Sequence, residues 1–420
     1  MSRVLAEKNN RATQLKKLLQ TAQKAATLKK SPFYTLKASQ KRAQLTTNLF
    51  LKAYDEKSKV AFRNVIMPTE IFYAMDIVPV CVETVCALLA NFNVTLQCLD
   101  SAEQNNYSRD ICSFTRCTLG AAIENYLPTP DFLACTSYYC DDSTKLFYTL
   151  SKKYEKDFFL LDIPYDHNNV NAVHYLENQL KEMVESIEKT LNRKIDMDKL
   201  SEAIRLSNEA RYYFVKLNEL RTKIPAPIGG GEAIDYAAIL AFTWGSKEIV
   251  DVYKTFYEEV KHKVENSDKP PQKRKIRILW RHLRPYYNNS LFDFIENECD
   301  VEVAFEEVNF IYWGEMDPDE PYRSLAKKLL ANPPVGDFQR WIGVTLNLID
   351  KYNIDGIISF NHWGCRQLCS GEGILKDILN KKGIPMIQIG GDCIDSREFS
   401  FAQLKTRIQA FLEMIKERNR

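Results

Sequence analysis

Three short segments of the chain each carry two cysteines, the residue type best suited to metal chemistry. Six of the eleven cysteines lie in the segments CSFTRC, CTSYYC and CRQLC. They are Cys112 and Cys117, Cys135 and Cys140, and Cys365 and Cys369. Cysteine thiolates hold zinc ions and iron–sulfur clusters, and paired thiols also form disulfides. The three pairs therefore predict a metal centre, an iron–sulfur cluster or a set of disulfides.

The N-terminal segment bears on the choice between metal and disulfide. MSRVLAEKNNRATQLKK is basic and lacks the apolar run of a secretory signal, although its composition also permits a transit peptide. Disulfides are rare in the reducing cytoplasm. We therefore expect a cytoplasmic protein in which the paired cysteines stay reduced.

The number of thiols indicates which metal group fits. A [4Fe–4S] cubane needs one ligand per iron, so six thiolates are too many for one cubane but match two cubanes joined through a shared sulfide. Structural zinc takes four ligands at short spacings and fits six dispersed cysteines less well. Free cysteine is also often buried, so the pairs are equally compatible on spacing alone with ordinary core positions. We interpret the remaining cysteines mainly as core residues: Cys81, Cys86, Cys98, Cys299 and Cys393.

Each cysteine pair adjoins an apolar run or a helical pattern. CSFTRC opens a helical pattern, which places Cys112 near a helix N-terminus, where backbone N–H groups and the helix dipole favour a thiolate. DFLACTS and DGIISF are apolar runs that predict strands, and the other two pairs lie at the ends of those runs. Ligands bind outside the carboxyl ends of parallel strands, so we expect these loops to face one cleft.

The order of the predicted elements gives the fold class. Strands and helices alternate over residues 59–167 and again over residues 273–420, which is typical of parallel sheets with helices on both faces. Residues 1–58 predict a helical N-terminal arm, and residues 168–272 predict a helical connector with a break at PAPIGGG. We therefore predict an α/β protein with two doubly wound parallel-sheet domains facing each other across a cluster-binding cleft.

Composition and charge constrain the partners. The formal net charge is +2, and no apolar run approaches the ~18 residues that a membrane span needs, so we expect neither a nucleic acid nor a membrane as partner. Residues 1–50 nevertheless hold eleven Lys or Arg residues and one acidic residue, Glu7. This arm predicts either a solvated helix face or a docking surface for an acidic partner.

Longer segments around the cysteines resemble a known family. Four segments are similar to subunits of 2-hydroxyacyl-CoA dehydratases and benzoyl-CoA reductases. They are PTEIFYAMDIVPV, the stretch from DICSFTRC to STKLF, NHWGCRQ and GIPMIQIGGDC. The resemblance implies two α/β domains around a low-potential iron–sulfur cluster whose three usual ligands fall on Cys112, Cys140 and Cys365. This chain adds a second cysteine in each loop, which resembles the branch called double-cubane cluster proteins.

The double-cubane resemblance implies a homodimer with an [8Fe–9S] cluster held by all six paired cysteines in each subunit. A separate ATP-dependent iron–sulfur reductase would supply single electrons, which this protein would store and use to reduce a small-molecule substrate. The alternative is the subunit of a 2-hydroxyacyl-CoA dehydratase or benzoyl-CoA reductase, with one [4Fe–4S] cluster and an acyl-CoA substrate. In dehydratases, a serine near the position of Val65 helps to hold the thioester. This chain lacks that serine, which favours the double-cubane interpretation.

Glu83 and His362 are the candidate catalytic residues. Glu83 follows the run VPVCV and matches a glutamate that some dehydratase subunits place beside the cluster as an acid or base, but it is equally compatible with a solvated loop position. His362 precedes Cys365 and is a candidate proton relay or a hydrogen-bond donor to the cluster, with a structural loop role as the alternative. Gly229 to Gly231 lack a following Lys-Ser/Thr and predict a hinge or turn rather than a phosphate loop.

Overall fold

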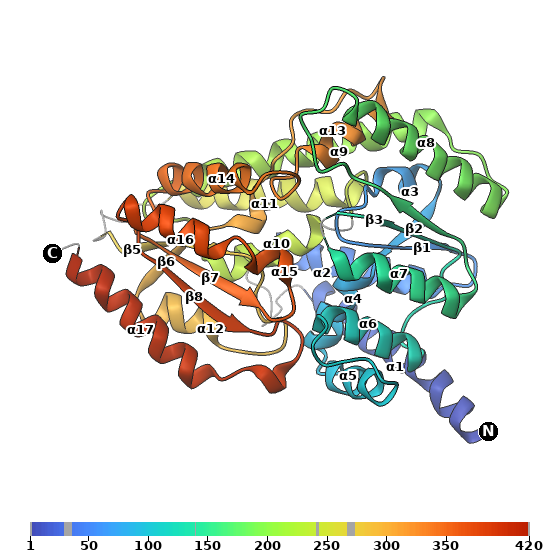
Figure 1. Ribbon diagram of the computed structural model, residues 1–420, viewed down its shortest axis with the longest axis horizontal. Helices are drawn as coiled ribbons and strands as arrows, with labels where there is room; N and C mark the ends of the chain where they lie inside the picture. The colour runs from blue at the N-terminus through green and yellow to red at the C-terminus, as the bar shows by residue number, and fades with distance from the viewer. Residues whose placement is uncertain (1, 29–35, 139, 241–242, 267–273, 419–420) are drawn as a thin grey trace.

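The computed structural model is an α/β structure with two four-stranded sheets, both fully parallel. It describes residues 2–28, 36–138, 140–240, 243–266 and 274–418. Figure 1 shows the two sheets side by side, with helices around each and a helical layer across both. The predicted fold class is confirmed.

The first sheet has the strand order β2-β1-β3-β4. Its strands are β1 (Lys59–Arg63), β2 (Ile77–Cys81), β3 (Phe132–Thr136) and β4 (Phe158–Leu161). The helices that follow these strands or join them are α3 (Glu70–Ala74), α4 (Val82–Asn91), α5 (Thr95–Gln104), α6 (Ser113–Ile123), α7 (Asp141–Tyr154) and α8 (Ala172–Leu191). Strands β2 and β3 are buried at every position, as expected for parallel strands that helices cover on both faces.

The second sheet repeats this layout with the order β6-β5-β7-β8. Its strands are β5 (Ile276–Arg281), β6 (Val301–Glu306), β7 (Gly356–His362) and β8 (Met386–Gly391). The helical elements that lie between or after these strands in the chain are α12 (Leu291–Asp293), a π-helical turn η1 (Phe294–Glu298), the 3₁₀ turns η2 (Glu307–Asn309) and η3 (Ser396–Glu398), α13 (Pro321–Leu330), α14 (Phe338–Tyr352), α15 (Arg366–Cys369), α16 (Glu372–Lys381) and α17 (Phe401–Arg418).

The remaining helices tie the two sheets together. They are α1 (Ser2–Thr27), α2 (Lys37–Ala53), α9 (Met197–Leu220), α10 (Gly230–Leu240) and α11 (Lys247–Glu265). One hydrophobic core contains Trp313, Leu325 and Val335 together with Phe72 and Leu176. The chain after β6 therefore returns to pack against the first sheet. In Figure 1, α13 accordingly lies beside α8 and α9. The domain boundaries drawn from the sequence stay predictions.

Two local features differ from the sequence-based expectations. Gly230 starts helix α10, and the N–H groups of Gly230 and Gly231 donate to the Glu296 carboxylate at 2.7 and 3.2 Å. The predicted turn at the glycines is therefore wrong at these two residues, because an internal carboxylate satisfies the free N–H groups of a helix start. Glu83 lies in the first turn of α4, since β2 ends at Cys81 and the helix begins at once.

The basic arm is partly neutralised within the chain. Lys41 pairs with Asp251 of α11 at 2.7 Å, and Arg42 pairs with Asp235 of α10 at 3.2 Å. Arg11 of α1 donates to the Tyr126 hydroxyl at 3.2 Å. These contacts pack the arm against the rest of the molecule and pair part of its positive charge with acidic side chains. Among the helices of the described ranges, none combines the length and apolar character that a membrane crossing requires.

Candidate functional site

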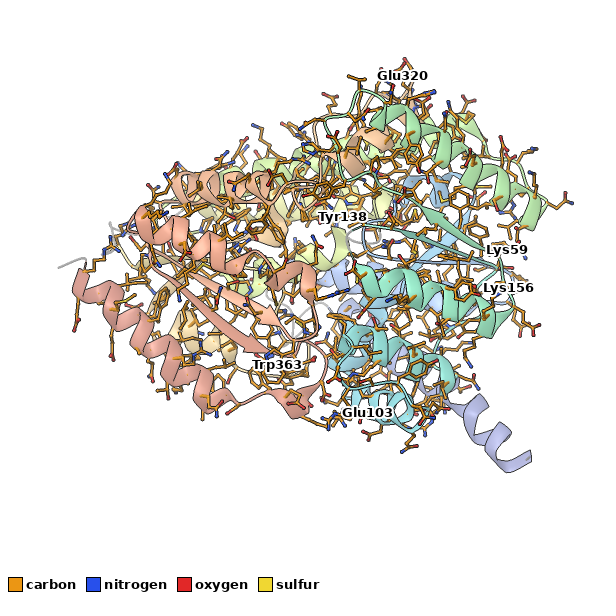
Figure 2. The ribbon with its side chains drawn as sticks, viewed as in Figure 1. Lys59, Glu103, Tyr138, Lys156, Glu320 and Trp363 are labelled. Carbon is orange, nitrogen blue, oxygen red and sulfur yellow. The ribbon has the colours of Figure 1, made fainter. Side chains whose placement is uncertain are left out.

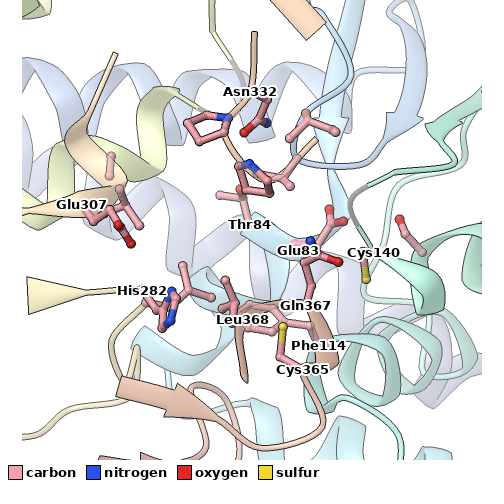
Figure 3. A pocket seen from close by; sticks show the side chains of 18 of the residues that line it. Glu83, Thr84, Phe114, Cys140, His282, Glu307, Asn332, Cys365, Gln367 and Leu368 are labelled. Carbon is pink, nitrogen blue, oxygen red and sulfur yellow. The ribbon is translucent and has the colours of Figure 1, made fainter. Parts of the chain in front are cut away.

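A cavity of about 340 Å³ lies between the carboxyl ends of the two sheets and takes its walls from both. Cys112 and Cys140 line it from the first α/β unit, and Cys365 and His362 line it from the second. Figure 3 shows Cys140 and Glu83 on one side of this cavity and Cys365 at another edge. The common cleft expected from the sequence is present, and it receives one cysteine from each pair.

These three cysteines share one structural position, the residue immediately before a helix. Cys112 is the N-cap of α6, Cys140 of α7 and Cys365 of α15. A helix N-terminus presents free N–H groups and the positive end of the helix dipole, both of which stabilise a thiolate or a negatively charged group bound to it. Three helix starts therefore direct positive potential toward the cavity.

Burial opposes ionisation of the same thiols when nothing is bound. Burial raises the pKa of Cys112 well above its ordinary value, and the nearby thiols of Cys365 and Cys140 raise it further. Burial likewise raises the pKa of Cys140 to about 12 and raises that of Cys365. Backbone N–H groups two to three residues downstream act in the opposite direction at all three cysteines. A positively charged metal group would reverse this balance by binding the thiolates.

The second cysteine of each pair lies elsewhere. Cys117 is fully buried inside α6 and contacts the thiols of Cys86 and Cys98, which together with burial raise its pKa. Cys135 is a fully buried residue of β3. Cys369 ends α15, and its sulfur donates to the His362 carbonyl oxygen at 3.6 Å. None of these second cysteines is part of the cavity wall.

His362 is the last residue of β7, and its side chain is fixed at both ring nitrogens. The backbone N–H of Cys393 donates to Nδ1 at 3.1 Å, so Nδ1 carries the lone pair. Burial lowers the pKa of His362, which keeps the ring neutral and leaves the proton on Nε2. Nε2 lies 3.3 Å from the Cys112 sulfur and is thereby assigned as a hydrogen-bond donor to it. The role of His362 as a proton relay or as a donor to a cluster stays a prediction.

Glu83 points into the cavity from the start of α4. Its carboxylate accepts a hydrogen bond from the Cys81 thiol at 3.3 Å. Burial raises the pKa of Glu83, while the fully buried Arg63 nearby partly opposes that rise. A carboxyl group with a raised pKa beside a cavity is suited to give and take a proton near neutral pH.

Contacts between the loops hold the cysteines in place across the two units. Tyr138 lies between the two halves of the molecule (Figure 2), and Gln367 donates to its hydroxyl at 3.2 Å. Arg366 pairs with Asp141 at 2.5 Å. Gly364 adopts a left-handed backbone with φ of 79°, and a Cβ there would lie 3.0 Å from the Cys112 Cα. Glycine is therefore required where the β7 loop approaches Cys112 most closely.

Sequence reasoning missed a polar wall on the far side of the cavity. His282 and Glu307 line it next to strand ends, and Lys328 lines it from α13. Figure 3 shows His282 and Glu307 on the opposite side of the cavity from Cys140. His282 directly follows the predicted strand KIRILW and Arg281, so the strand-end rule that selected two of the cysteine pairs would also have selected His282.

Comparison with known proteins decides the family. The family model described as 2-hydroxyglutaryl-CoA dehydratase, D-component, matches residues 64–415. The chain belongs to this family. The resemblance found in the sequence is thereby confirmed at the level of the family, and the match covers the residues that line the cavity, all six paired cysteines and every strand except β1, which ends at Arg63.

Several curated proteins are similar to this member of the dehydratase D-component family along most of their length. The (R)-phenyllactyl-CoA dehydratase alpha subunit of Clostridium sporogenes is 24% identical over 380 residues, which cover 87% of this chain and 91% of that protein. The (R)-2-hydroxyisocaproyl-CoA dehydratase alpha subunit of Clostridioides difficile is 23% identical, with 90% and 95% covered. A benzoyl-CoA reductase subunit of Thauera aromatica is 23% identical, with 76% and 79% covered. Dehydratases and reductases of CoA thioesters thus both occur among the relatives, which supports an enzymatic activity for this chain.

Proposed function

We propose that this protein is a component of a CoA-thioester dehydratase or reductase that holds one [4Fe–4S] cluster on Cys112, Cys140 and Cys365. The observation that carries the proposal is the convergence of three N-cap cysteines, one from each pair, on a single cavity between the sheets. The relatives named as acting on CoA thioesters supply the substrate class.

The donor set suits an iron–sulfur cluster, because cysteine thiolates are the usual ligands of such clusters. In the part of the chain that the structure describes, no three His, Cys, Asp or Glu side chains are grouped as a site for one metal ion. A cubane is larger than a single ion, and each cysteine binds a different iron, so its ligands stand further apart. Three cysteines leave one iron of a cubane for a non-protein ligand. When bound, such a cluster supplies one-electron transfer at low potential.

Residues of this chain have distinct roles in this proposal. His362 donates its Nε2 proton to the Cys112 sulfur and so stabilises negative charge on a ligand. Glu83 moves a proton to or from the substrate at its carboxylate, which the cavity keeps partly desolvated. Val65 lines the cavity where the family serine is expected, so it contributes an apolar contact to the thioester instead of a hydrogen bond.

We take the proposed substrate class and partners from the relatives. The names of the relatives include 2-hydroxyacyl-CoA dehydratases, so the proposed substrate is a 2-hydroxyacyl-CoA and the proposed reaction is loss of water. An ATP-dependent iron–sulfur reductase would supply the electron. The relatives are named as single subunits of larger enzymes, which favours assembly with a second subunit, whereas the double-cubane interpretation predicts a homodimer.

A second candidate, the double-cubane reductase with an [8Fe–9S] cluster, has one observation in its favour. Cys135 lies close enough to Cys140, and Cys369 close enough to Cys365, for each pair to interact electrostatically. Two of the additional thiols are therefore near the cavity cysteines. Cys117 weighs against this candidate, because its thiol contacts Cys86 and Cys98 in a fully buried position.

Iron and sulfide counting on anaerobically purified protein tests the proposal. We expect about four irons per chain, whereas about eight would favour the double-cubane reductase. A chain without iron after anaerobic cluster reconstitution would contradict both candidates. Dehydration of a 2-hydroxyacyl-CoA in the presence of ATP and the reductase partner then tests the substrate class, with the same mixture lacking ATP as the control.

A further inference from the structure

His282 occupies an unusual backbone position at the end of a central strand. It directly follows β5 and has a φ of 68°, in the left-handed region. A non-glycine residue held there costs about 1–2 kcal/mol, and such residues persist where the surrounding structure fixes them. Here the preceding Arg281 is fully buried and bound to the carboxylates of Glu307 and Glu372. The strained backbone places the His282 imidazole in the cavity wall.

The Glu372 carboxylate determines which His282 nitrogen carries the proton. His282 Nε2 lies 3.1 Å from Glu372 Oε1. Ser359 donates to Glu372 Oε2 at 2.5 Å, and Arg281 donates to Oε1. Burial alone would raise the pKa of Glu372, but the His282, Arg281 and Ser359 contacts outweigh it and lower the pKa below its ordinary value. An ionised carboxylate only accepts hydrogen bonds, so Nε2 is the donor.

The other nitrogen is consequently an acceptor. Burial, followed by the charge of Arg281, lowers the pKa of His282, so the ring is neutral and Nδ1 carries a lone pair. The Trp341 ring contacts the imidazole edge to face, with ring centres 5.4 Å apart. Within the described residues, Nδ1 is buried and has no hydrogen-bond partner. A buried acceptor without a donor is unfavourable by about 1–3 kcal/mol, which a ligand in the cavity can recover.

We propose that His282 Nδ1 accepts a hydrogen bond from a hydroxyl or amide N–H of the substrate that enters this cavity, and that His282 is a substrate-binding residue. The inference rests on the proposed CoA-thioester function, which supplies two sources of this donor. One is the 2-hydroxyl of the acyl group, and the other is an amide N–H of the pantetheine arm. The side of the cavity opposite Cys140 would thereby fix the position of the substrate relative to the cysteines.

Binding of two thioesters to the cluster-loaded protein tests the proposal by calorimetry. (R)-Lactoyl-CoA carries the 2-hydroxyl, and propionyl-CoA lacks it. The test variants are His282→Phe, which removes both ring nitrogens at similar size, and His282→Asn, because asparagine tolerates a left-handed backbone but is too short to reproduce the imidazole. The matched control is Ser359→Ala, which removes another donor to Glu372 from a residue outside the cavity wall. Unfolding midpoints of all variants show whether they fold.

Each outcome has one meaning. Roughly ten-fold weaker binding of (R)-lactoyl-CoA alone in both His282 variants would support the inference with the hydroxyl as donor, and equal weakening for both thioesters would support it with the amide. Unchanged binding in folded His282 variants would overturn the inference and leave the proposed function intact. Equal weakening in Ser359→Ala would also overturn it, because the effect would then arise from the Glu372 network. Failure of the wild-type protein to bind either thioester would overturn both.

Discussion

The imidazole Nε2 of His362 lies 3.3 Å from the sulfur of Cys112, although the two residues are 250 positions apart in the chain. His362 ends β7 of the second sheet, and Cys112 begins α6 of the first α/β unit. The contact therefore crosses the gap between the sheets at the proposed cluster site. A proposed cluster ligand of one unit thus contacts a histidine of the other, so this contact depends on how the two units are placed.

The first prediction concerns this hydrogen bond. His362→Phe should shift the reduction potential of the bound cluster to more negative values by about 50 mV, because a lost N–H donor no longer stabilises the reduced, more negative state. A redox titration followed by electron paramagnetic resonance measures the shift. Trp363→Phe is the control, since Trp363 is the adjacent residue but is 49% exposed. An unchanged potential in His362→Phe at full iron content would contradict the assigned donor role.

The second prediction separates the two cysteines of each pair. Alanine at each of the cavity cysteines, Cys112, Cys140 or Cys365, should remove most of the iron, because each thiolate would bind a different iron of the cluster. Alanine at Cys117, Cys135 or Cys369 should leave about four irons per folded chain. Iron analysis with a parallel measurement of the folded fraction gives the result. Iron loss in the second set, above all in Cys117→Ala, would instead favour the double-cubane cluster.

The third prediction concerns a buried ion pair that includes Lys328 of the cavity wall. Lys328 Nζ lies 2.6 Å from Glu70 Oε1, with the two side chains 8% and 0% exposed. Glu70→Leu should lower the free energy of unfolding by about 3–5 kcal/mol, because it leaves the lysine charge buried without its partner. The double variant Glu70→Leu/Lys328→Met should recover part of that loss, since both charges are then gone.

Denaturant unfolding measures these changes, and an exposed pair provides the control. Lys199 pairs with Asp76 at 2.8 Å, with side chains 51% and 63% exposed. Lys199→Ala should change the free energy of unfolding by about 0–1 kcal/mol, because solvent screens such a pair. A double variant at Glu70 and Lys328 that is less stable than Glu70→Leu alone would show that the lysine contributes chiefly through its packing on Trp244 and Trp313.

The fourth prediction concerns the glycine beside Cys112. Gly364→Ala should reduce both iron content and stability, because φ of 79° disfavours alanine and the new methyl would press on the Cys112 backbone. Gly343→Ala is the matched control, since a Cβ at Gly343 would meet no atom within 4 Å and the residue sits inside helix α14. That control should raise the free energy of unfolding by about 0.5–1 kcal/mol and leave iron content unchanged. Full iron content in Gly364→Ala would show that the loop can move without displacing Cys112.

The sequence alone determined the fold class and the family. Alternating apolar runs and helical patterns predicted two parallel sheets, and the residues around the cysteines carried the resemblance that the family model confirms. Strand ends gave the place of the cavity, because parallel strands all present their carboxyl ends to the same side. These properties depend on local periodicity and on short motifs, which a chain displays without being folded.

Only the tertiary structure decided which residues meet. The family resemblance places the usual ligands on Cys112, Cys140 and Cys365, but only the fold shows that helix starts bring these three to one cavity, while Cys117 contacts Cys86 and Cys98 inside a helical layer. The tautomers of His362 and His282 likewise depend on Cys393 and Glu372, whose proximity no local pattern encodes. Contacts between distant segments arise when the two units pack together. This packing sets the direction in which each side chain points, and the residue type alone does not set it.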